Sequence, residues 1–414
     1  MRLLLSAYAC EPGRGSEPGV GWNWALELAR LGHDVWTLTR ANNRESIENA
    51  LRTTPDVGRL RFLYYDLPQP MLWIKRSPPG LYAYYFLWQI GAYRAARRAH
   101  ELQHFEHVLH VTIGSYRTPS FMGGLEIPFT FGPVGGGETT PKRLREGYGI
   151  RGRLADSCRD LMNAWVRHDP LMNRTFSRAQ RILVKTDETA RWIHDRHRAK
   201  IHQQFEVGVS PRAQDGRHDL KSDTSGPFRI LYVGRLLYWK GIHLGLRAFS
   251  EHLRNHPDST LTLVGAGSDE TRLKRLATSL RIEGAIRWMP WIEQSELASI
   301  YHDHDAFLLP SLHDSSGNAL LEAMSYGLPV ICLELGGPGV LIDNACGRVI
   351  PARQRSESEV IGDLAEALDQ LGSDDGMRSR LRRGALAAAQ ARTWRRTVGS
   401  AVALIQKTPS RPTD

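Results

Sequence analysis

Residues 306–333 read AFLLPSLHDSSGNALLEAMSYGLPVICL, an apolar run followed by a polar stretch, a helical segment and a second apolar run. Short apolar runs bounded by turn residues are typical of buried strands. A helix between two such strands forms a β-α-β unit, in which the strands are parallel. This stretch therefore predicts an α/β fold.

The polar stretch lies directly before the helical segment, at residues 310–317. The first N–H groups of a helix have no partner within the helix, and the positive end of the helix dipole lies there. A helix start of this kind binds phosphate. The residues expected to contact it are Ser316, Gly317, Asn318 and Ala319.

Two acidic residues flank this helix start. Glu322 lies on the helix and is expected to bind ribose hydroxyls. Asp314 precedes the helix and is expected to accept hydrogen bonds from the hydroxyls of a sugar. Together with the phosphate-binding helix start, these residues offer partners for phosphate and for hydroxyl groups.

The turn GRLLYWKG at residues 234–241 follows another apolar run and is a second candidate site. The Arg235 guanidinium can bind two phosphate oxygens at once, and Lys240 supplies a mobile positive charge. The two cations therefore suit a diphosphate. The alternative is a surface pair that bridges neighbouring carboxylates.

Expected strands alternate with helical segments through both halves of the chain. They cover residues 2–6, 34–39, 60–65, 107–113, 128–131 and 181–185 in the first half, and 228–233, 261–264, 285–288, 306–309 and 329–333 in the second. The polar stretch 208–227 between the two sets is typical of a linker. We therefore expect two doubly wound domains, at residues 1–207 and 228–392.

The composition is that of a globular protein, with 41% hydrophobic and 24% charged residues among 414. No apolar run is long enough to span a membrane, and no secretory signal pattern is present at the N-terminus. The four cysteines lie far apart without CxxC spacing. We expect reduced thiols in a cytoplasmic protein.

The net charge of +10 is concentrated in one region, since residues 140–217 hold 17 Lys and Arg but nine Asp and Glu. A basic stretch attracts nucleic acid, anionic lipid or phosphorylated substrates, or is simply a solvated helical surface. No nucleic-acid-binding motif is present, so we expect no nucleic acid partner. Residues 73–88 mix aromatic and basic side chains, which suits either a membrane interface or a helix buried on the first sheet.

In these motifs the chain resembles glycosyltransferase family 4, the retaining glycosyl transferases group 1. The resemblance rests on the Gly-Arg and Lys-Gly turn at 234–241, on the acidic pair Asp314 and Glu322, on the glycine loop 264–267 and on residues 323–330, AMSYGLPV, which match the family's usual continuation of the acidic pair. It implies the GT-B fold, with two Rossmann-like domains facing across a cleft and a C-terminal helix, residues 393–414, packing back on the first.

The resemblance also implies roles for individual residues. Arg235, Lys240 and Asp314 are expected to be catalytic. Donor-binding residues are expected to be Gly19, Gly234, Gly265, Gly267, Ser316, Gly317, Asn318, Ala319 and Glu322. No metal or other cofactor is expected, because the two cations and the helix start can neutralise the leaving diphosphate, and Asp303-His304-Asp305 is expected to be structural.

Two positions depart from the family pattern. Asp314 stands where the family usually has Glu, and Thr112 stands where many relatives have the second His of a His-x-His motif. His110 occupies the first of these histidine positions and is either a core residue or a functional one. His110, Thr112 and Glu138, which ends the glycine-rich stretch 132–138, are the residues expected on the acceptor side.

The sequence thus predicts a retaining glycosyltransferase that uses an NDP-sugar. The expected acceptor is a glycan or polyprenyl-linked oligosaccharide in cell-surface polysaccharide synthesis, at an anionic membrane surface on the inner face of the plasma membrane. One alternative is an NDP-sugar epimerase or hydrolase of the same fold. The other is a non-catalytic protein that binds sugar nucleotides.

Overall fold

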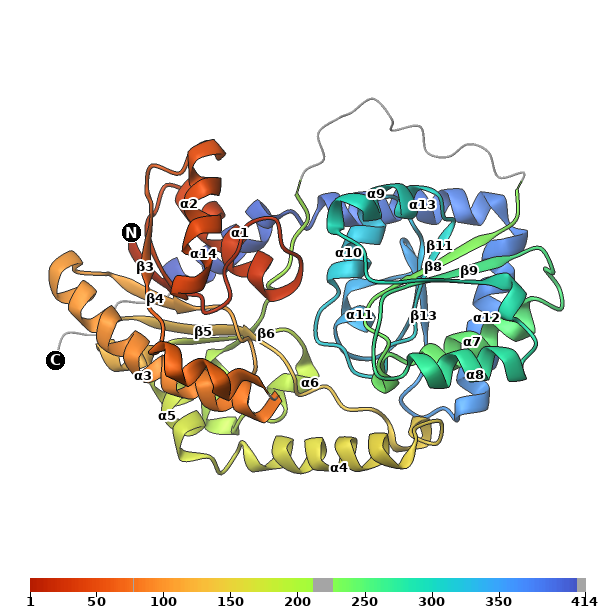
Figure 1. Cartoon of the computed structure of the whole chain (residues 1–414), viewed down its shortest axis with the longest axis horizontal. Coiled ribbons are helices and arrows are strands. Elements are labelled where there is room, and N and C mark those ends of the chain that lie inside the picture. Colours follow the sequence, from red (N-terminus) through yellow and green to blue (C-terminus); the bar gives the residue numbers. More distant parts are fainter. Residues whose placement is uncertain (77, 211–225, 408–414) are drawn as a thin grey trace. The chain divides into compact units, whose positions relative to one another are not determined.

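A computed structural model describes residues 1–76, 78–210 and 226–407 (Figure 1). The chain divides into two compact units. The first comprises residues 1–137, 162–206 and 394–414, and the second comprises residues 138–161 and 207–393. Most of the expected linker, residues 208–227, lies outside the described residues.

The first unit contains a seven-stranded parallel sheet in the order β3-β2-β1-β4-β5-β6-β7. Its strands are β1 (Arg2–Ser6), β2 (Asp34–Thr39), β3 (Leu60–Tyr64), β4 (His107–His110), β5 (Phe129–Val134), β6 (Arg181–Val184) and β7 (Ile201–Gln203). Its helices are α1 (Ser16–Arg30), α2 (Arg44–Thr53), α3 (Pro78–Gln103), α5 (Pro170–Arg178), α6 (Asp187–Ala190) and α14 (Trp394–Gln406). The order reverses between β1 and β4, as in a doubly wound sheet.

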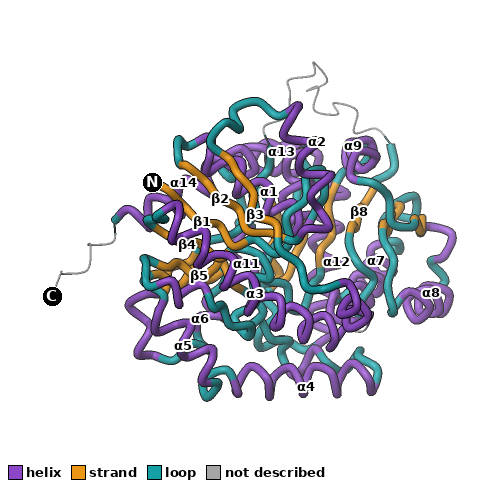
Figure 2. Tube along the Cα trace, turned by 60° about the vertical axis from the view of Figure 1, so that its left-hand side comes forward, coloured by secondary structure: helices purple, strands orange, loops and turns teal. Residues whose placement is uncertain are grey.

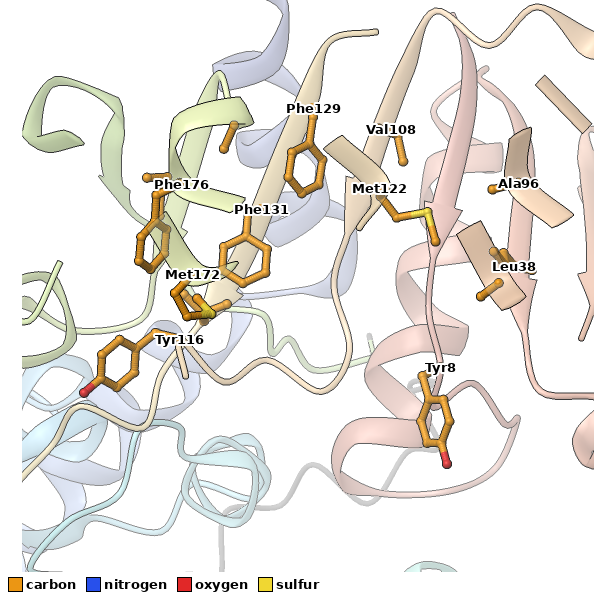
Figure 3. Packing of buried hydrophobic residues seen from close by; sticks show 14 of the residues in the cluster. Tyr8, Leu38, Ala96, Val108, Tyr116, Met122, Phe129, Phe131, Met172 and Phe176 are labelled. Atoms are coloured by element: carbon orange, nitrogen blue, oxygen red, sulfur yellow. The ribbon is translucent and has the colours of Figure 1, made fainter. Parts of the chain in front are cut away.

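Aromatic side chains fill the core of the first unit. Phe129 and Phe131 project from β5, and Phe131 lies beside Phe176 of α5 (Figure 3). On α3, Tyr85 and Trp88 are buried in the same cluster. The part of residues 73–88 that carries these two side chains is therefore core, as one of the two interpretations of that segment predicts, whereas Trp73 and Tyr82 are exposed.

Helix α1 begins at Ser16, so the glycines at positions 19 and 21 lie in its first turns. A Cβ at Gly19 would lie 2.1 Å from the Arg14 carbonyl oxygen, and one at Gly21 would lie 2.1 Å from the Ala9 carbonyl oxygen. These glycines let the loop after β1 fold back over the start of the helix.

The second unit contains a six-stranded parallel sheet in the order β10-β9-β8-β11-β12-β13. Its strands are β8 (Arg229–Val233), β9 (Thr260–Val264), β10 (Ile286–Met289), β11 (Ala306–Leu309), β12 (Val330–Leu333) and β13 (Gly347–Ile350). Its helices are α7 (Ile242–His252), α8 (Glu270–Ser279), α9 (Gln294–His302), α10 (Asn318–Ser325), α11 (Gly336–Leu341), α12 (Glu357–Ser373) and α13 (Asp375–Gln390). Both sheets thus have the predicted doubly wound topology.

Helix α4 (Ile150–Trp165) runs as one continuous helix from the second unit into the first (Figure 2). Residues 138–161, which the sequence analysis placed in the first domain, group with the second unit. Their contacts explain the grouping: the Gly147 N–H donates to the Glu357 carboxylate at 2.8 Å, and Arg272 donates to the Gly147 carbonyl at 2.7 Å. Among the described helices, none is long and apolar enough to cross a membrane.

Candidate functional site

The strand order of the second sheet reverses between β8 and β11. The loops that leave the carboxyl ends of two such strands diverge and leave room for a ligand. These two loops are residues 234–241 and 310–317, the two stretches that the sequence analysis selected. The fold therefore brings the two predicted motifs to one edge of one sheet.

Backbone contacts hold the two loops together. The Leu312 N–H donates to the Trp239 carbonyl at 2.8 Å. Gly241 has φ +64°, and a Cβ there would lie 1.8 Å from the Pro310 carbonyl oxygen. The rings of Trp239 and His313 stack with centroids 5.4 Å apart and planes inclined by 14°. Glycine at 241 is required both by the left-handed backbone and by this close approach.

Lys240 and Asp314 meet across this junction. The Lys240 ammonium donates to the Asp314 carboxylate, and both side chains are partly buried. Lys240 thus pairs with a carboxylate, as the alternative interpretation of the turn predicts. That carboxylate belongs to Asp314, the residue predicted to bind the sugar. Arg235 lies at the other end of the turn and is exposed. One cation is therefore held in place while the other is accessible.

Glycines also bring the loop after β9 against the loop after β8. A Cβ at Gly265, where φ is +141°, would lie 2.0 Å from the Gly234 carbonyl oxygen, and one at Gly267 would lie 2.1 Å from the Leu236 carbonyl oxygen. The Leu236 N–H donates to the Ala266 carbonyl at 3.0 Å. These predicted donor-binding glycines approach the chain's own backbone, which fixes the loop that carries Arg235.

The start of α10 has no side-chain cap at Gly317, and the first N–H groups of a helix have no partner within the helix. Asn318 and Ala319 form its first turn. One turn later, Glu322 accepts a hydrogen bond of 3.2 Å from the hydroxyl of Tyr301 on α9. Burial and the neighbouring Glu322 carboxylate raise the pKa of Tyr301 well above its usual value, so this hydroxyl stays protonated as a donor.

An apolar pocket of about 230 Å³ opens at the same edge of the sheet. Its walls come from the ends of β8 and β9, from the loops after β8, β9 and β10, and from α9: Val233, Gly234, Arg235, Val264, Gly265, Ala266, Trp291, Ile292 and Leu297. A larger pocket of about 420 Å³ is lined by His256, Asp305 and Arg378 among others. None of the predicted site residues lines that larger pocket, and we assign it no part in the site.

Sequence reasoning missed the loop that supports Asp314 from behind. The Gly337 N–H donates to the Asp314 carbonyl at 2.7 Å. Gly336 has φ +56°, and a Cβ there would lie 2.1 Å from the same oxygen. The run GGPG at residues 336–339, a glycine-rich stretch that follows an apolar strand, could have indicated this loop.

A buried network from α4 reaches the same two loops and was also missed. The Asp156 carboxylate accepts a hydrogen bond of 3.1 Å from the Tyr238 hydroxyl. It lies 3.4 Å from Nε2 of His313 and 3.7 Å from Nε of Arg145. Tyr238 belongs to the turn that carries Lys240, and His313 directly precedes Asp314. Asp156 is therefore placed to hold both loops.

The pKa of Asp156 gives this network a pH dependence. Burial by itself raises the pKa of the carboxyl, but His313, the Tyr238 hydroxyl and Arg145 favour the ionised form, and the net pKa is below its usual value. A carboxyl with a lowered folded pKa stabilises the native state above its unfolded pKa, about 3.9. That contribution is lost as the pH falls through the folded pKa.

Asp156→Asn is therefore expected to lower the free energy of unfolding by about 1–3 kcal/mol at pH 7, because hydrogen bonds to a charged group are lost. The difference from the wild type should shrink below about pH 4, where the wild-type carboxyl also becomes protonated. Urea titrations at several pH values measure both effects, with the exposed Asp258→Asn as the control. A difference that is constant from pH 7 to pH 3 would contradict an ionised Asp156.

Glu138 lies in the second unit, not in the first as the sequence analysis placed it. It is buried, and a Cβ at Gly336 would lie 3.2 Å from its Cγ atom. Arg159 donates to its carbonyl oxygen at 3.2 and 3.3 Å. Glu138 therefore packs beside the loop that supports Asp314.

The remaining acceptor-side residues, His110 and Thr112, are buried in the first unit. The Thr112 hydroxyl accepts a hydrogen bond of 3.0 Å from the Ala9 N–H. Burial lowers the pKa of His110 to about 4, so its ring is neutral at physiological pH.

Sequence reasoning missed Glu17 in the first unit. Its carboxylate accepts hydrogen bonds from the N–H groups of Ile113 and Gly114, at 3.2 and 3.1 Å, and so fixes the loop after β4.

One group of potential metal ligands is present in the described residues, His252, His256 and Asp369. The Nδ1 atom of His252 lies 2.5 Å from the Asp369 carboxylate, a hydrogen-bond distance. The two imidazoles stack with planes inclined by only 21°, and a metal ion cannot lie in the plane of both rings in that arrangement. We therefore interpret the group as a hydrogen-bonded cluster.

The residues Asp303-His304-Asp305 have structural partners. His304 contacts the Thr262 hydroxyl at 2.8 Å and the Ile300 carbonyl at 2.6 Å. The Asp305 carboxylate accepts from the Arg229 N–H at 3.0 Å. These bonds tie the start of β11 to β8 and β9.

Part of the chain is similar to a known protein family. The family model described as Glycosyl transferases group 1 matches residues 218–387, which include both loops. Glycogen synthase of Mycobacterium tuberculosis is 37% identical over 120 residues, which is 29% of this chain and 29% of that protein. The matched region thus spans less than a third of this relative.

Solved structures match over nearly the full length of the chain. WaaG, a glycosyltransferase involved in lipopolysaccharide biosynthesis, superposes with a TM-score of 0.61 at 16% identity, covering 98% of this chain and 100% of that one. Anabaena HepE in complex with UDP gives a TM-score of 0.63 at 13% identity, with coverages of 99% and 100%. The chain thus has the GT-B fold, and its second unit is similar to the glycosyl transferases group 1.

Proposed function

We propose that the protein is a retaining glycosyltransferase that moves a sugar from an NDP-sugar to an acceptor. The observation that carries the proposal is the meeting of Lys240 and Asp314 at the reversal point of the second sheet, beside the uncapped start of α10. This edge combines fixed positive charge with acceptors for hydroxyl groups. A sugar joined to a diphosphate requires both.

Each part of the donor has a matching part of the site. The apolar pocket beside Arg235 is of a size to hold a nucleotide base, with the exposed ring of Trp291 at its wall. Arg235, Lys240 and the first N–H groups of α10 bind the diphosphate. Glu322, oriented by Tyr301, binds the ribose hydroxyls. Asp314 binds a hydroxyl of the sugar. The complex of HepE with UDP supports a uridine nucleotide among the donors to be tested.

In the proposed reaction the acceptor hydroxyl attacks the anomeric carbon from the face that the diphosphate leaves. The bond from this carbon to the phosphate oxygen breaks, the bond to the acceptor oxygen forms, and the departing phosphate takes the proton of the acceptor. The configuration is retained without an enzyme nucleophile. The chain's residues position the donor and stabilise the negative charge that develops on the diphosphate.

For the acceptor we propose a glycan or polyprenyl-linked oligosaccharide of cell-surface polysaccharide synthesis, bound at the inner face of the plasma membrane. The basic residues of region 140–217 support an anionic surface as partner. The structural similarity to WaaG is consistent with a surface glycan. No metal or other cofactor enters the proposal, because Arg235, Lys240 and the start of α10 supply the positive charge.

Glu322→Ala is expected to abolish donor binding. A ligand present at 100 times its Kd stabilises the native state by about 2.7 kcal/mol, which raises the melting temperature by several degrees. We therefore expect one family among UDP, GDP, ADP and their sugar conjugates to raise the Tm of the wild type but not of Glu322→Ala. The control is Glu296→Ala, which removes an exposed carboxylate from α9.

Product analysis separates the proposal from its alternatives. A transferase leaves the donor largely intact until an acceptor is added, whereas a hydrolase or an epimerase releases or rearranges the sugar on its own. Nucleotide binding without turnover on any glycan or polyprenyl-linked acceptor would favour a non-catalytic protein. The absence of a Tm shift with every nucleotide would contradict the donor site itself.

A further inference from the structure

Two polar side chains of helix α4 lie on its buried face. Asp156 and Asn163 are buried, as is Gly152, and these residues recur at intervals of four and seven along the helix. They therefore lie on one face. Asp156 forms the network with Tyr238 and His313 described above, and the Asn163 side chain accepts a hydrogen bond of 2.6 Å from Arg117.

The opposite face of α4 is apolar and exposed. Ile150 is 79% exposed, Leu154 62%, Leu161 73% and Trp165 65%. With the exposed Cys158 they recur at intervals of four, four, three and four residues, which places all five side chains on one stripe. A helix on the surface of a globular protein normally has the reverse arrangement, with its apolar stripe towards the core. Exposed apolar patches of this kind mark contact surfaces.

Basic side chains border the apolar stripe. At 100° per residue, Arg151 flanks it on one side and Arg153 on the other, and both are exposed. The helix carries two carboxylates, but Asp156 is buried, and Asp160 forms an ion pair of 2.8 Å with Arg145. The exposed side of α4 is thus apolar along its centre and carries positive charge on both edges of its first turn.

We propose that this face of α4 binds an anionic membrane surface, with the apolar stripe (Ile150, Leu154, Cys158, Leu161 and Trp165) inserted among the acyl chains and the arginines at the headgroups. An apolar stripe between cationic edges is the pattern of a helix that lies in the plane of a membrane interface. Tryptophan is favoured at that depth, and arginine side chains extend to the phosphates.

The charges favour a membrane over a second copy of the chain. A symmetric dimer in which the two α4 helices run parallel would bring the Arg151 and Arg153 edges of the two copies together, and like charges oppose such a contact. Anionic lipids would instead neutralise both edges. The inference rests on the membrane location in the proposed function, and it adds the surface that makes the contact and the chemistry of the lipid.

The contact also concerns the donor site. The buried face of the helix holds Asp156, which contacts both loops of that site. The membrane-binding stripe and the loop-holding carboxylate are therefore on opposite sides of the same helix. Lipid binding through α4 would place the donor loops next to the surface in which a lipid-linked acceptor resides.

Leu161→Glu is expected to lower binding to anionic vesicles at least tenfold. The full chain would be sedimented with vesicles of phosphatidylcholine alone and of phosphatidylcholine with phosphatidylglycerol, without donor or acceptor, so that the result does not depend on catalysis. The wild type should bind the anionic vesicles, and binding should weaken as salt rises. The matched control is Leu102→Glu on α3, where the replaced leucine is 77% exposed.

Cys158 allows the contact to be located directly. It is the exposed one of the four cysteines, since Cys10, Cys332 and Cys346 are buried. An environment-sensitive fluorophore on Cys158 should shift its emission to the blue with anionic vesicles and not with phosphatidylcholine alone.

Three results would overturn the proposal. The first is vesicle binding that Leu161→Glu leaves unchanged. The second is a fluorophore on Cys158 whose emission does not shift to the blue while the protein is bound to vesicles. The third is a dimer that forms without lipid and that Leu161→Glu dissociates. The last would assign the face to a second copy of the chain. Thermal melting of Leu161→Glu checks that the variant is folded, and its donor-induced Tm shift reports on the proposed function separately.

Discussion

Lys240→Ala is expected to lower kcat by about 100- to 1,000-fold, the usual effect of removing one group that stabilises charge in a transition state. Negative charge on the leaving diphosphate is greatest as the glycosidic bond breaks, so the loss should fall on kcat more than on KM. In the free protein Lys240 is held by Asp314. The variant therefore also releases the carboxylate that is proposed to bind the sugar. Initial rates with donor and acceptor varied in turn measure both parameters.

Lys274→Ala is the control for this change. Lys274 pairs with Glu270 on the exposed surface of α8 at 2.7 Å, and a surface ion pair of this type contributes little. Its removal should leave kcat unchanged. A Lys240→Ala enzyme within about threefold of the wild-type kcat would contradict the assignment of Lys240 to the diphosphate.

Gly241→Ala should be the most damaging single substitution of a glycine in the donor site. Residue 241 has φ +64°, which costs an L-residue about 1 kcal/mol or more, and the new Cβ would lie 1.8 Å from the Pro310 carbonyl oxygen. Relieving that overlap requires one of the two loops to move. We expect the free energy of unfolding to fall by about 3 kcal/mol or more, because strain and a steric clash combine. Activity should fall further than stability, since Lys240 and Asp314 would separate.

The matched control is Gly362→Ala in α12. A Cβ at this position meets no atom within 4 Å, so the substitution should stabilise the helix by about 0.5–1 kcal/mol. Chemical denaturation and turnover are measured on both variants. Equal stabilities of the Gly241 and Gly362 variants would contradict the close junction of the two loops.

Most of the fold could be predicted from the apolar runs. The predicted bounds of β1, β2 and β11 agree with the structure at both ends. Strands β7 and β13 were missed. Both lie at an edge of their sheet, and their sequences, IHQ and GRVI, contain polar or small residues. An edge strand has a neighbour on only one side and needs fewer apolar side chains, so its sequence shows no clear apolar run.

The sequence located the parts of the candidate site but not their supports. The motifs at 234–241 and 310–317 stand out because cations or small polar residues follow an apolar strand. Asp156 was missed because residues 138–161 lie between β5 and β6 of the first sheet in the chain, and no local pattern shows that they pack on the second unit. Gly19, Gly265 and Gly267 were predicted to bind the donor, and a Cβ at each of them would meet a backbone carbonyl oxygen of this chain.

The discontinuous units affect the order in which a newly made chain can fold. The second unit is complete once residue 393 has been synthesised, but the first still lacks α14. That helix packs on α1, and Gln204 is held by the Thr397 carbonyl at 3.2 Å and the Ser400 hydroxyl at 2.8 Å. The first unit is therefore the last to be finished during synthesis, and a ribosome that stops before residue 394 leaves the α1 surface uncovered for chaperones or proteases to recognise.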